Sequence, residues 1–344
     1  MIPAERIIRE DSERVVAACR PELEKLGGLT VMVTGATGFI GGSLVDALLE
    51  FSRDAARPCK LLLPARLPDR ARGLRPGWAE SPRLRWLEWR GGGPIEEFDG
   101  PCDLMVHAAS PVSAAVFALD PTERAREMIE LTRTVAGLAA RRQARTLLYL
   151  SSGAVYGPQP ANLDAIPESY AGSPDPVEPA SAYGIAKRAC EAVCFASGVN
   201  AVSARLFACI GPRQSLQSGF AVPDFFLQAL AAGGIRLTSD GRALRTFCYV
   251  SDVVAALIKL LAGADAPREC NVGAEAPVLS IAEVAERIAR RMGGIEVEKA
   301  QSVSSGAAQR YIPDISRMKQ LYRPQVTLDE GVGRIADFLR AGAA

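Results

Sequence analysis

The stretch VMVTGATGFIGG, residues 31–42, decides the fold. An apolar, β-branched run leads into Gly35, Gly38 and Gly41, and residues 39–51 then follow with helical periodicity. Glycines at this spacing between a strand and a helix are typical of a dinucleotide-binding turn. The first glycine permits the tight turn, the second lets a pyrophosphate approach the backbone, and the third lets helix and strand pack closely. We therefore predict that this helix N-terminus binds the phosphates of a dinucleotide.

Strand-like and helix-like segments alternate along the chain outward from this turn. Strands are predicted at residues 29–35, 59–66, 83–89, 102–110, 144–152 and 199–207, and helices at residues 11–26, 39–51, 121–142 and 181–197. This alternation predicts an α/β fold with a doubly wound parallel sheet of the Rossmann type. Asp11 or Ser12 is expected to cap the first helix, and Asp252 to cap a later one.

Composition limits the classes of function. The chain has 344 residues and a formal net charge of +1, so no global field attracts nucleic acid or an anionic membrane. It contains no apolar run near the length of a membrane span. The charged N-terminus lacks a signal peptide's apolar stretch, so we expect a cytoplasmic location. One histidine and eight scattered cysteines without a C-x-x-C pair predict no metal site.

A second group of residues carries reaction chemistry. Tyr183 and Lys187 in SAYGIAKR are four residues apart, so they share one face of a helix. The preceding strand ends in YLSSGAVYG, which contains Ser152. A nearby ammonium and a positively charged nicotinamide favour ionisation of a tyrosine whose ordinary pKa is about 10. With Ser152 hydrogen-bonding the substrate oxygen, Tyr183 would move its proton during oxidation of an alcohol or reduction of a ketone.

Five motifs, TGATGFIG, HAAS, SSGAVYG, YGIAK and RTFCYVSDV, occur in an order that resembles the extended short-chain dehydrogenase/reductase family. More narrowly they resemble its NAD(P)-dependent nucleotide-sugar epimerase/dehydratase branch, from about residue 28 to the C-terminal LDEGVGRIADFL. The resemblance implies NAD or NADP as cofactor and a nucleotide-sugar as substrate. It implies a catalytic set of Ser152, Tyr183 and Lys187, with Ser151 as a substitute hydroxyl.

The resemblance also implies an organisation in two lobes and, as in many family members, a homodimer. We expect a helical extension (residues 1–27), an NAD(P)-binding Rossmann domain (28–205, with parts of 236–275 returning to it) and a smaller C-terminal α/β substrate lobe (206–235 and 276–344). The expected cofactor contacts, besides Tyr183 and Lys187, are Gly35, Thr37, Gly38, Phe39, Ile40, Gly41, Arg66, Ala108, Ala109 and Ser110. The expected substrate contacts are Ser152, Arg213 and Arg245, the last on the diphosphate, which suits a guanidinium fork.

Departures from the family pattern separate the reactions. Family dehydratases carry an Asp-Glu pair at the places of Gly153 and Ala154, and decarboxylases carry a Glu at the second. These residues cannot transfer protons, so dehydration and decarboxylation are disfavoured unless Glu168 or Glu178 supplies the acid. A C4-type epimerase and a 4-keto-sugar reductase remain, since both need only the Ser–Tyr–Lys set and hydride transfer.

The end of the second strand bears on the cofactor. NAD enzymes usually place an acid there to bind the ribose 2′-hydroxyl. The segment LLLPARLPDR offers Arg66 instead, which favours a 2′-phosphate and therefore NADP. Two further alternatives are reduction of a non-sugar carbonyl and a non-catalytic NADP-binding sensor. His107, at the end of an apolar strand, is expected to be held by hydrogen bonds and to do no acid–base work.

Overall fold

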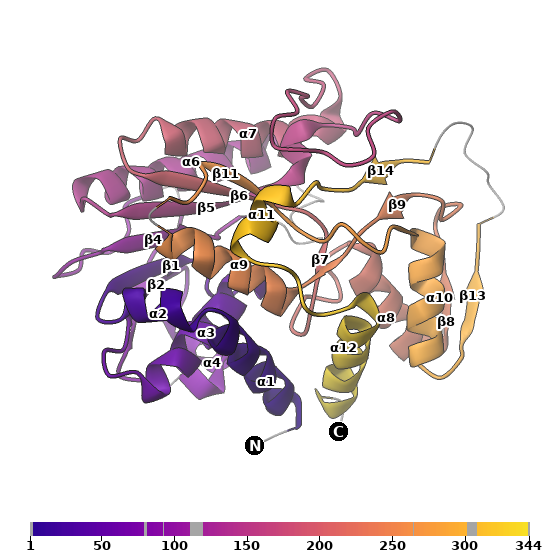
Figure 1. Ribbon diagram of the computed structural model, residues 1–344, viewed down its shortest axis with the longest axis horizontal. Helices are drawn as coiled ribbons and strands as arrows, with labels where there is room; N and C mark the ends of the chain where they lie inside the picture. The colour runs from indigo at the N-terminus through magenta and orange to yellow at the C-terminus, as the bar shows by residue number, and fades with distance from the viewer. Residues whose placement is uncertain are drawn as a thin grey trace.

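The computed structural model describes residues 3–78, 81–91, 93–110, 120–263, 265–300 and 308–342. A seven-stranded, wholly parallel sheet forms its centre, in the order β11-β6-β5-β4-β1-β2-β3 (Figure 1). Its strands are β1 (Thr30–Thr34), β2 (Lys60–Ala65), β3 (Leu84–Glu88), β4 (Leu104–His107), β5 (Thr146–Ser152), β6 (Ala201–Leu206) and β11 (Glu269–Val272). The strand order reverses beside β1, as in a Rossmann fold. The predicted doubly wound parallel sheet is therefore confirmed.

Both faces of the sheet are buried under helices, which explains its near-continuous apolar strands. The flanking helices are α3 (Phe39–Asp54), α4 (Pro68–Leu74), α6 (Pro121–Arg141), α7 (Ala182–Phe195) and α9 (Val250–Ala262). Successive strand residues point to opposite faces. Val31 and Val33 thus pack in the core with α3 and α9, whereas Met32 packs in the core with α6 and α7.

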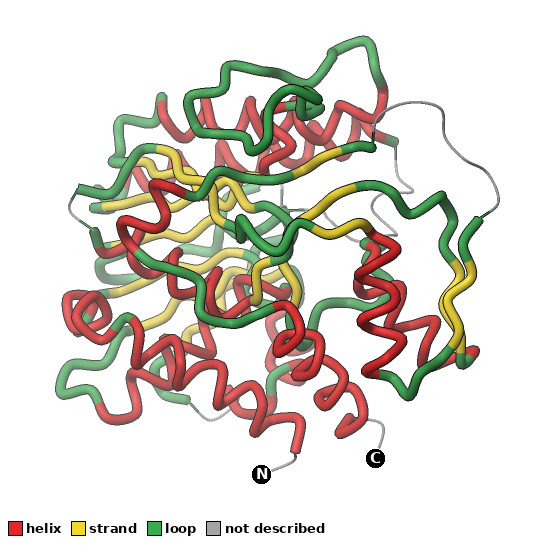
Figure 2. Tube along the Cα trace, turned by 45° about the vertical axis from the view of Figure 1, so that its right-hand side comes forward, coloured by secondary structure: helices red, strands yellow, loops and turns green. Residues whose placement is uncertain are grey.

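Short strands and helices lie beside the central sheet in Figure 2, and the labels of Figure 1 show that they belong to the chain after β6. This part of the chain contains short sheets, β10-β7, β12-β9-β14 and β13-β8. Its strands are β7 (Cys209–Ile210), β8 (Gly234–Arg236), β9 (Leu244–Arg245), β10 (Cys248–Tyr249), β12 (Leu279–Ser280), β13 (Glu296–Glu298) and β14 (Arg310–Tyr311). Its helices are α8 (Ala221–Ala232), α10 (Ile281–Arg291), α11 (Ser316–Leu321) and α12 (Leu328–Gly342). Strand β11 is an exception, because it follows β6 in the chain and yet belongs to the central sheet. It lies within residues 236–275, the part that was expected to return to the Rossmann domain.

The N-terminal segment forms two helices, α1 (Pro3–Ala18) and α2 (Arg20–Leu26). The first begins at Pro3, where proline suits a first turn. The prediction that Asp11 or Ser12 caps this helix is therefore wrong. Asp11 lies inside it and accepts hydrogen bonds from Tyr249 Oη at 2.7 Å and Arg334 Nε at 2.9 Å. These bonds tie α1 to β10 and α12.

The prediction that Asp252 caps α9 is also wrong. The N-cap is Tyr249, which makes no side-chain capping bond. Asp252 accepts hydrogen bonds from Tyr322 Oη at 2.6 Å and from the backbone amides of Gln325 and Val326 at 3.0 and 2.9 Å. Its carboxylate thus fastens the segment between α11 and α12 to the sheet's helical layer.

Candidate active site

The glycine turn has the room that a dinucleotide requires. Gly35 has φ +70°, and a Cβ there would stand 2.6 Å from the Ala109 amide nitrogen. A Cβ at Gly41 would stand 2.5 Å from the Gly35 carbonyl oxygen. These two glycines are therefore required by the packing of the protein itself. A Cβ at Gly38 would meet only the Gly35 carbonyl oxygen, at 3.1 Å. The missing side chain at Gly38 thus leaves space that protein atoms do not fill, and this fits a phosphate-binding turn.

The surrounding residues are consistent with this use. Thr37 is exposed, and Phe39 and Ile40 at the first turn of α3 are partly exposed, so the helix N-terminus is open to solvent. Ala108 and Ser110 follow β4 beside the turn. The Ser110 hydroxyl is buried, and no described residue hydrogen-bonds it. The residues present therefore fit a dinucleotide cofactor along this edge of the sheet.

Arg66 lies just after β2, as expected, with two thirds of its side chain exposed (67%). Its guanidinium donates to Glu127 of α6 at 2.5 Å. A carboxylate therefore stands beside the arginine that the sequence assigns to a 2′-phosphate.

Ser152, Tyr183 and Lys187 are brought together at the end of β5 and the start of α7. The Ser152 hydroxyl adjoins the Tyr183 phenol and favours its ionised form, an effect on the pKa of Tyr183 that is smaller than that of burial. Lys187 Nζ donates to the Leu150 carbonyl oxygen at 2.7 Å and lies 5.9 Å from the centroid of the Tyr183 ring. The backbone bond fixes this ammonium beneath the site, on the helix face that the four-residue spacing predicts.

Burial shifts the ionisation of this group. Burial raises the pKa of Tyr183 to about 12, and the nearby Ser152 hydroxyl and Arg124 guanidinium partly oppose this rise. Burial likewise lowers the pKa of Lys187 to about 8. The resting tyrosine is therefore protonated at neutral pH. Arg124, which lies on α6 and is 6% exposed, is a positive neighbour that sequence reasoning missed.

The hydroxyl of Ser151, the residue before Ser152, faces a different set of groups. Ser151 lies against the Glu191 carboxylate. That carboxylate also accepts from Arg205 Nε at 2.9 Å, and Arg205 in turn donates to Tyr156 Oη at 2.9 Å. Consecutive strand residues point to opposite sides, which explains the separation. Ser152, rather than Ser151, adjoins Tyr183.

Arg245 lies at the edge of the same site, where it contacts Tyr311, a residue that sequence reasoning missed. Its guanidinium donates to the Leu244 and Gln309 carbonyl oxygens at 2.8 and 3.2 Å and stands 5.7 Å from the centroid of the Tyr311 ring. The Tyr311 phenol donates to the Leu206 carbonyl oxygen at 3.5 Å and lies near the Ser152 hydroxyl. The one sequence signal for it is Gly153, where a Cβ would stand 2.6 Å from the Tyr311 hydroxyl.

Arg213 belongs to a different cluster. It pairs with Asp46 of α3 at 2.8 Å, and Arg75 pairs with the same carboxylate at 3.0 Å. Arg75 also donates to the Gly38 carbonyl oxygen at 3.2 Å. Arg213 therefore lies on the cofactor side, behind the glycine turn.

The two alternative acids have other contacts. Glu168 accepts from the Asn271 amide at 2.9 Å and lies 3.7 Å from Arg317. Glu178 lies on the exposed loop that leads into α7. Among the described residues, no carboxylate is hydrogen-bonded with the Ser152 or Tyr311 hydroxyl.

His107 is held as expected. Its Nδ1 lies 2.8 Å from Thr34 Oγ1 and its Nε2 lies 3.1 Å from Thr132 Oγ1. Since Thr132 donates its only proton to the Met128 carbonyl oxygen, Nε2 carries the proton and Nδ1 accepts. Burial lowers the pKa of His107 to about 3, so the ring stays neutral.

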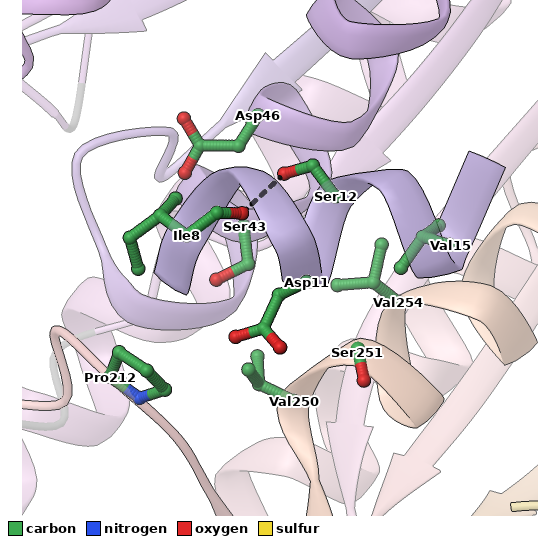
Figure 3. Close-up of a pocket in the computed structure, with 10 residues that line it drawn as sticks. All are labelled: Ile8, Asp11, Ser12, Val15, Ser43, Asp46, Pro212, Val250, Ser251 and Val254. Carbon is green, nitrogen blue, oxygen red and sulfur yellow. Dashed lines mark hydrogen bonds between the residues drawn. The ribbon is translucent and has the colours of Figure 1, made fainter. Parts of the chain in front are cut away.

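Two cavities lie at other places in the described structure. The larger, of about 500 Å³, lies between the first turn of α6 and the start of α7. A cavity of about 20 Å³ lies between α1, α3 and α9 (Figure 3), room for about one water molecule. The described residues hold no cluster of three metal-ligating side chains. In the same described part of the chain, no helix has the length and apolar character to cross a membrane.

Comparisons with known proteins agree with this geometry. The chain is 30% identical over 324 residues to UDP-glucuronic acid decarboxylase 3 of Arabidopsis thaliana, covering 91% of this chain and 88% of that protein. Its fold matches UDP-glucose 4-epimerase of Thermotoga maritima, with a TM-score of 0.73, 20% identity and coverage of 92% of this chain and 100% of the other. UDP-glucuronic acid 4-epimerase of Bacillus cereus, solved with UDP-glucuronic acid and NAD, matches with TM-score 0.73, 21% identity and coverage of 91% and 99%.

The family model for NAD-dependent epimerases and dehydratases matches residues 31–273, about 70% of the chain. The expected enzyme type, an extended short-chain dehydrogenase/reductase, is thereby confirmed. The chain belongs to the NAD-dependent epimerase/dehydratase family.

Proposed function

We propose that this protein is an NAD-dependent C4 epimerase of a nucleotide-sugar. The observation that carries the proposal is the group at the end of β5, in which Ser152 adjoins Tyr183 and the buried Lys187 ammonium lies 5.9 Å from the centroid of the Tyr183 ring. Bound NAD would supply the hydride acceptor. Ser152 would donate to the sugar oxygen. Tyr183 would first lose its own proton, which the Lys187 ammonium and the positive charge of bound NAD would favour, and it would then take the hydroxyl proton and later return it. Return of the hydride to the other face of the keto-sugar would complete epimerisation.

The side chains that follow Ser152 support simple hydride transfer over elimination. Gly153 and Ala154 carry no acid, and the space above Gly153 is taken by the Phe207 and Tyr311 side chains. Glu168 is engaged with Asn271 and Arg317. An elimination of water needs a base and an acid near the sugar, so dehydration is the less suited reaction.

The surroundings of Arg66 favour NAD over NADP. Its pairing with Glu127 would place a carboxylate close to an added 2′-phosphate, and like charges repel. The Glu127 carboxylate can accept a hydrogen bond from a ribose hydroxyl. In NAD enzymes an acid at the end of the second strand usually has this role. A retained NAD suits an epimerase, since each cycle returns the hydride, whereas a reductase consumes NADPH.

A UDP-sugar is the proposed substrate. UDP-linked sugars appear in the names of the decarboxylase relatives and of the epimerase neighbours. Arg245 lies beside the Ser152 group and is suited to the diphosphate. Its environment is consistent with an anion: burial lowers the pKa of Arg245 from its ordinary value, and a phosphate would offset that cost.

A second candidate is decarboxylation of a UDP-uronic acid, which the sequence disfavours. The named decarboxylase relatives, 27–30% identical, favour it. Oxidation at C4 of a uronic acid gives a β-keto acid, which loses carbon dioxide without a protein acid. The lack of an acid at Gly153 and Ala154 therefore does not exclude decarboxylation. The homodimer, the cytoplasmic location and the two-lobe division stay predictions.

Two measurements test the proposal. Mass spectrometry of the nucleotide released by denaturing the purified protein should find NAD. The protein should then convert UDP-glucose to UDP-galactose, or UDP-glucuronic acid to its C4 epimer, without added cofactor. Release of carbon dioxide from UDP-glucuronic acid would favour the decarboxylase. A melting temperature raised by NADPH and not by NADH, with no retained nucleotide, would favour a reductase and give Arg66 its phosphate role.

A further inference from the structure

Arg75 is a buried arginine that follows α4 and lies against α3. Its Nη1 donates to Asp46 Oδ2 at 3.0 Å, and its Nη2 donates to the Gly38 carbonyl oxygen at 3.2 Å. The guanidinium also fills the room beside Gly42, because a Cβ on that glycine would collide with Nη2. The glycine turn and this arginine are therefore packed as one unit.

The Arg75 guanidinium is held in one orientation by its neighbours. Its Cζ lies 5.1 Å from the centroid of the Trp78 ring. The Trp78 indole donates to Asp46 Oδ1 at 2.7 Å, so the carboxylate that receives Arg75 is itself fixed. The donors of a guanidinium form a rigid fork, and two different acceptors on this fork set its plane. Nη2 is therefore aimed at the Gly38 carbonyl oxygen by contacts within the protein.

The Gly38 carbonyl belongs to the peptide unit that also carries the Phe39 amide. This carbonyl points along α3, where it accepts from the Gly42 amide at 3.1 Å as well as from Arg75. A trans peptide unit is planar, so its N–H points opposite to its C=O. Phe39 is the first residue of α3, and the amides of a first helical turn have no acceptor inside the helix. By holding the carbonyl, Arg75 thus keeps the Phe39 N–H pointing out of the helix N-terminus.

The charge of this cluster suits an anion. Arg213 donates to Asp46 Oδ2 at 2.8 Å, so two guanidinium groups share one carboxylate. These groups sum to a charge of one positive unit near the start of α3, where the helix dipole adds positive potential. Arg213 has φ +62°, a left-handed conformation uncommon outside glycine. The fold therefore maintains an unfavourable backbone conformation at a residue of this cluster.

We propose that Arg75 is a positioning residue of the cofactor site, which holds the Gly38–Phe39 peptide so that the Phe39 amide faces the cofactor's diphosphate. This inference rests on the proposed function for the choice of NAD as the ligand, but not on any reaction of a sugar. An Arg75→Met variant keeps an apolar side chain of similar length and loses both the charge and the fork. Its dissociation constant for NAD should rise about 10- to 100-fold, as for the loss of one hydrogen bond to a charged group.

The first test is calorimetric titration with NAD of protein freed of retained nucleotide. Arg142→Met is the matched control, because Arg142 also lies over an aromatic ring, that of Phe98 at 4.3 Å, and donates to a backbone carbonyl, that of Phe98 at 2.9 Å. It lies at the C-terminal end of α6, and its substitution should change NAD affinity less than about twofold.

Arg75→Lys separates positioning from charge, and it serves alone if Arg75→Met does not fold. Lysine keeps the positive charge but lacks the fork that reaches Asp46 and Gly38 together. Arg75→Lys should therefore also bind NAD about 10-fold or more weakly than the unaltered protein. Affinity restored by lysine, or unchanged in either variant, would overturn the proposal.

The second test observes the Phe39 amide directly by NMR. The pair Gly-Phe occurs twice, at residues 38–39 and 219–220, so ¹³C-carbonyl glycine with ¹⁵N-phenylalanine selects two amide signals. A Phe220→Leu substitution removes one of them and assigns the other. Saturating NAD should move the Phe39 signal downfield in the unaltered protein and in Arg142→Met, and less than about half as far in Arg75→Lys. Equal shifts in all three proteins would overturn the inference.

The two proposals fail in different ways. Weakened NAD binding by the Arg75 variants, without turnover of any UDP-sugar by the unaltered protein, would uphold the inference and overturn only the proposed function. Full NAD affinity in the Arg75 variants would overturn the inference, whatever the activity. An unaltered protein that binds no NAD would overturn both.

Discussion

A substitution at Gly38 separates cofactor binding from folding. The residue precedes α3 with φ −79° and ψ −180°, an extended conformation open to any residue. A Gly38→Ala methyl group would meet only the Gly35 carbonyl oxygen, at 3.1 Å, which needs to yield by a few tenths of an ångström. The loss of stability should therefore be below about 1 kcal/mol, the cost of alanine at a helix N-cap.

The same methyl group would stand where a pyrophosphate approaches the turn. Overpacking of about 1–3 kcal/mol corresponds to a loss of roughly 5- to 150-fold in NAD affinity. Gly41→Ala is the contrasting variant, because its methyl group would stand 2.5 Å from the same carbonyl oxygen and should destabilise the apoprotein itself.

Thermal unfolding with and without NAD measures both effects. Gly38→Ala should keep the melting temperature of the apoprotein within a few degrees and lose most of the NAD-induced rise, since that rise follows the affinity. Gly41→Ala should lower the apoprotein melting temperature. A Gly38→Ala protein with the full NAD-induced rise would refute the assignment of this turn to the cofactor.

Three further predictions follow from buried groups. Gly153→Ala should lower kcat and stability together, because its Cβ would stand 2.6 Å from both Phe207 Cζ and Tyr311 Oη; an unchanged enzyme would contradict that packing. His107, the one histidine, has its pKa lowered to about 3, so its imidazole ¹H signals should not titrate between pH 7.5 and 5 by NMR. Burial raises the pKa of Asp11 to about 6, so the folded state binds this proton more tightly than the unfolded state. Relative to Asp11→Asn, the native protein should lose up to about 3 kcal/mol as pH rises from about 4 to about 6.5 in urea unfolding; parallel pH profiles would refute this.

The sheet and the Ser–Tyr–Lys group follow from local sequence. The glycine turn between a strand and a helix, and the spacing of Tyr183 and Lys187, depend on neighbours a few residues away. Both are carried by α3 and α7 as predicted. The place of His107 at the end of an apolar strand likewise indicated a structural role. The hydrogen bonds of its ring with Thr34 and Thr132 are the physical basis of that role.

The features that sequence reasoning missed depend on distant partners. The local sequence around Asp252 resembles a helix cap, yet its hydrogen-bond donors come from residues 322–326. Asp11 likewise binds Tyr249 and Arg334. Tyr311 lies on a two-residue strand, too short to show an alternating pattern, and its register is set by β9. Gly153 was the one local sign of this residue, because a Cβ there would stand 2.6 Å from the Tyr311 hydroxyl.

The proposed reaction is reversible hydride transfer from the sugar C4 to bound NAD, with Tyr183 moving the hydroxyl proton. The most direct measurement is incubation of the protein with UDP-glucose deuterated at C4, in ordinary water, followed by NMR of the products. The account predicts UDP-galactose that keeps its deuterium at C4, and no product from a Tyr183→Phe variant that still binds NAD. Loss of the deuterium to solvent, or full conversion by Tyr183→Phe, would contradict it.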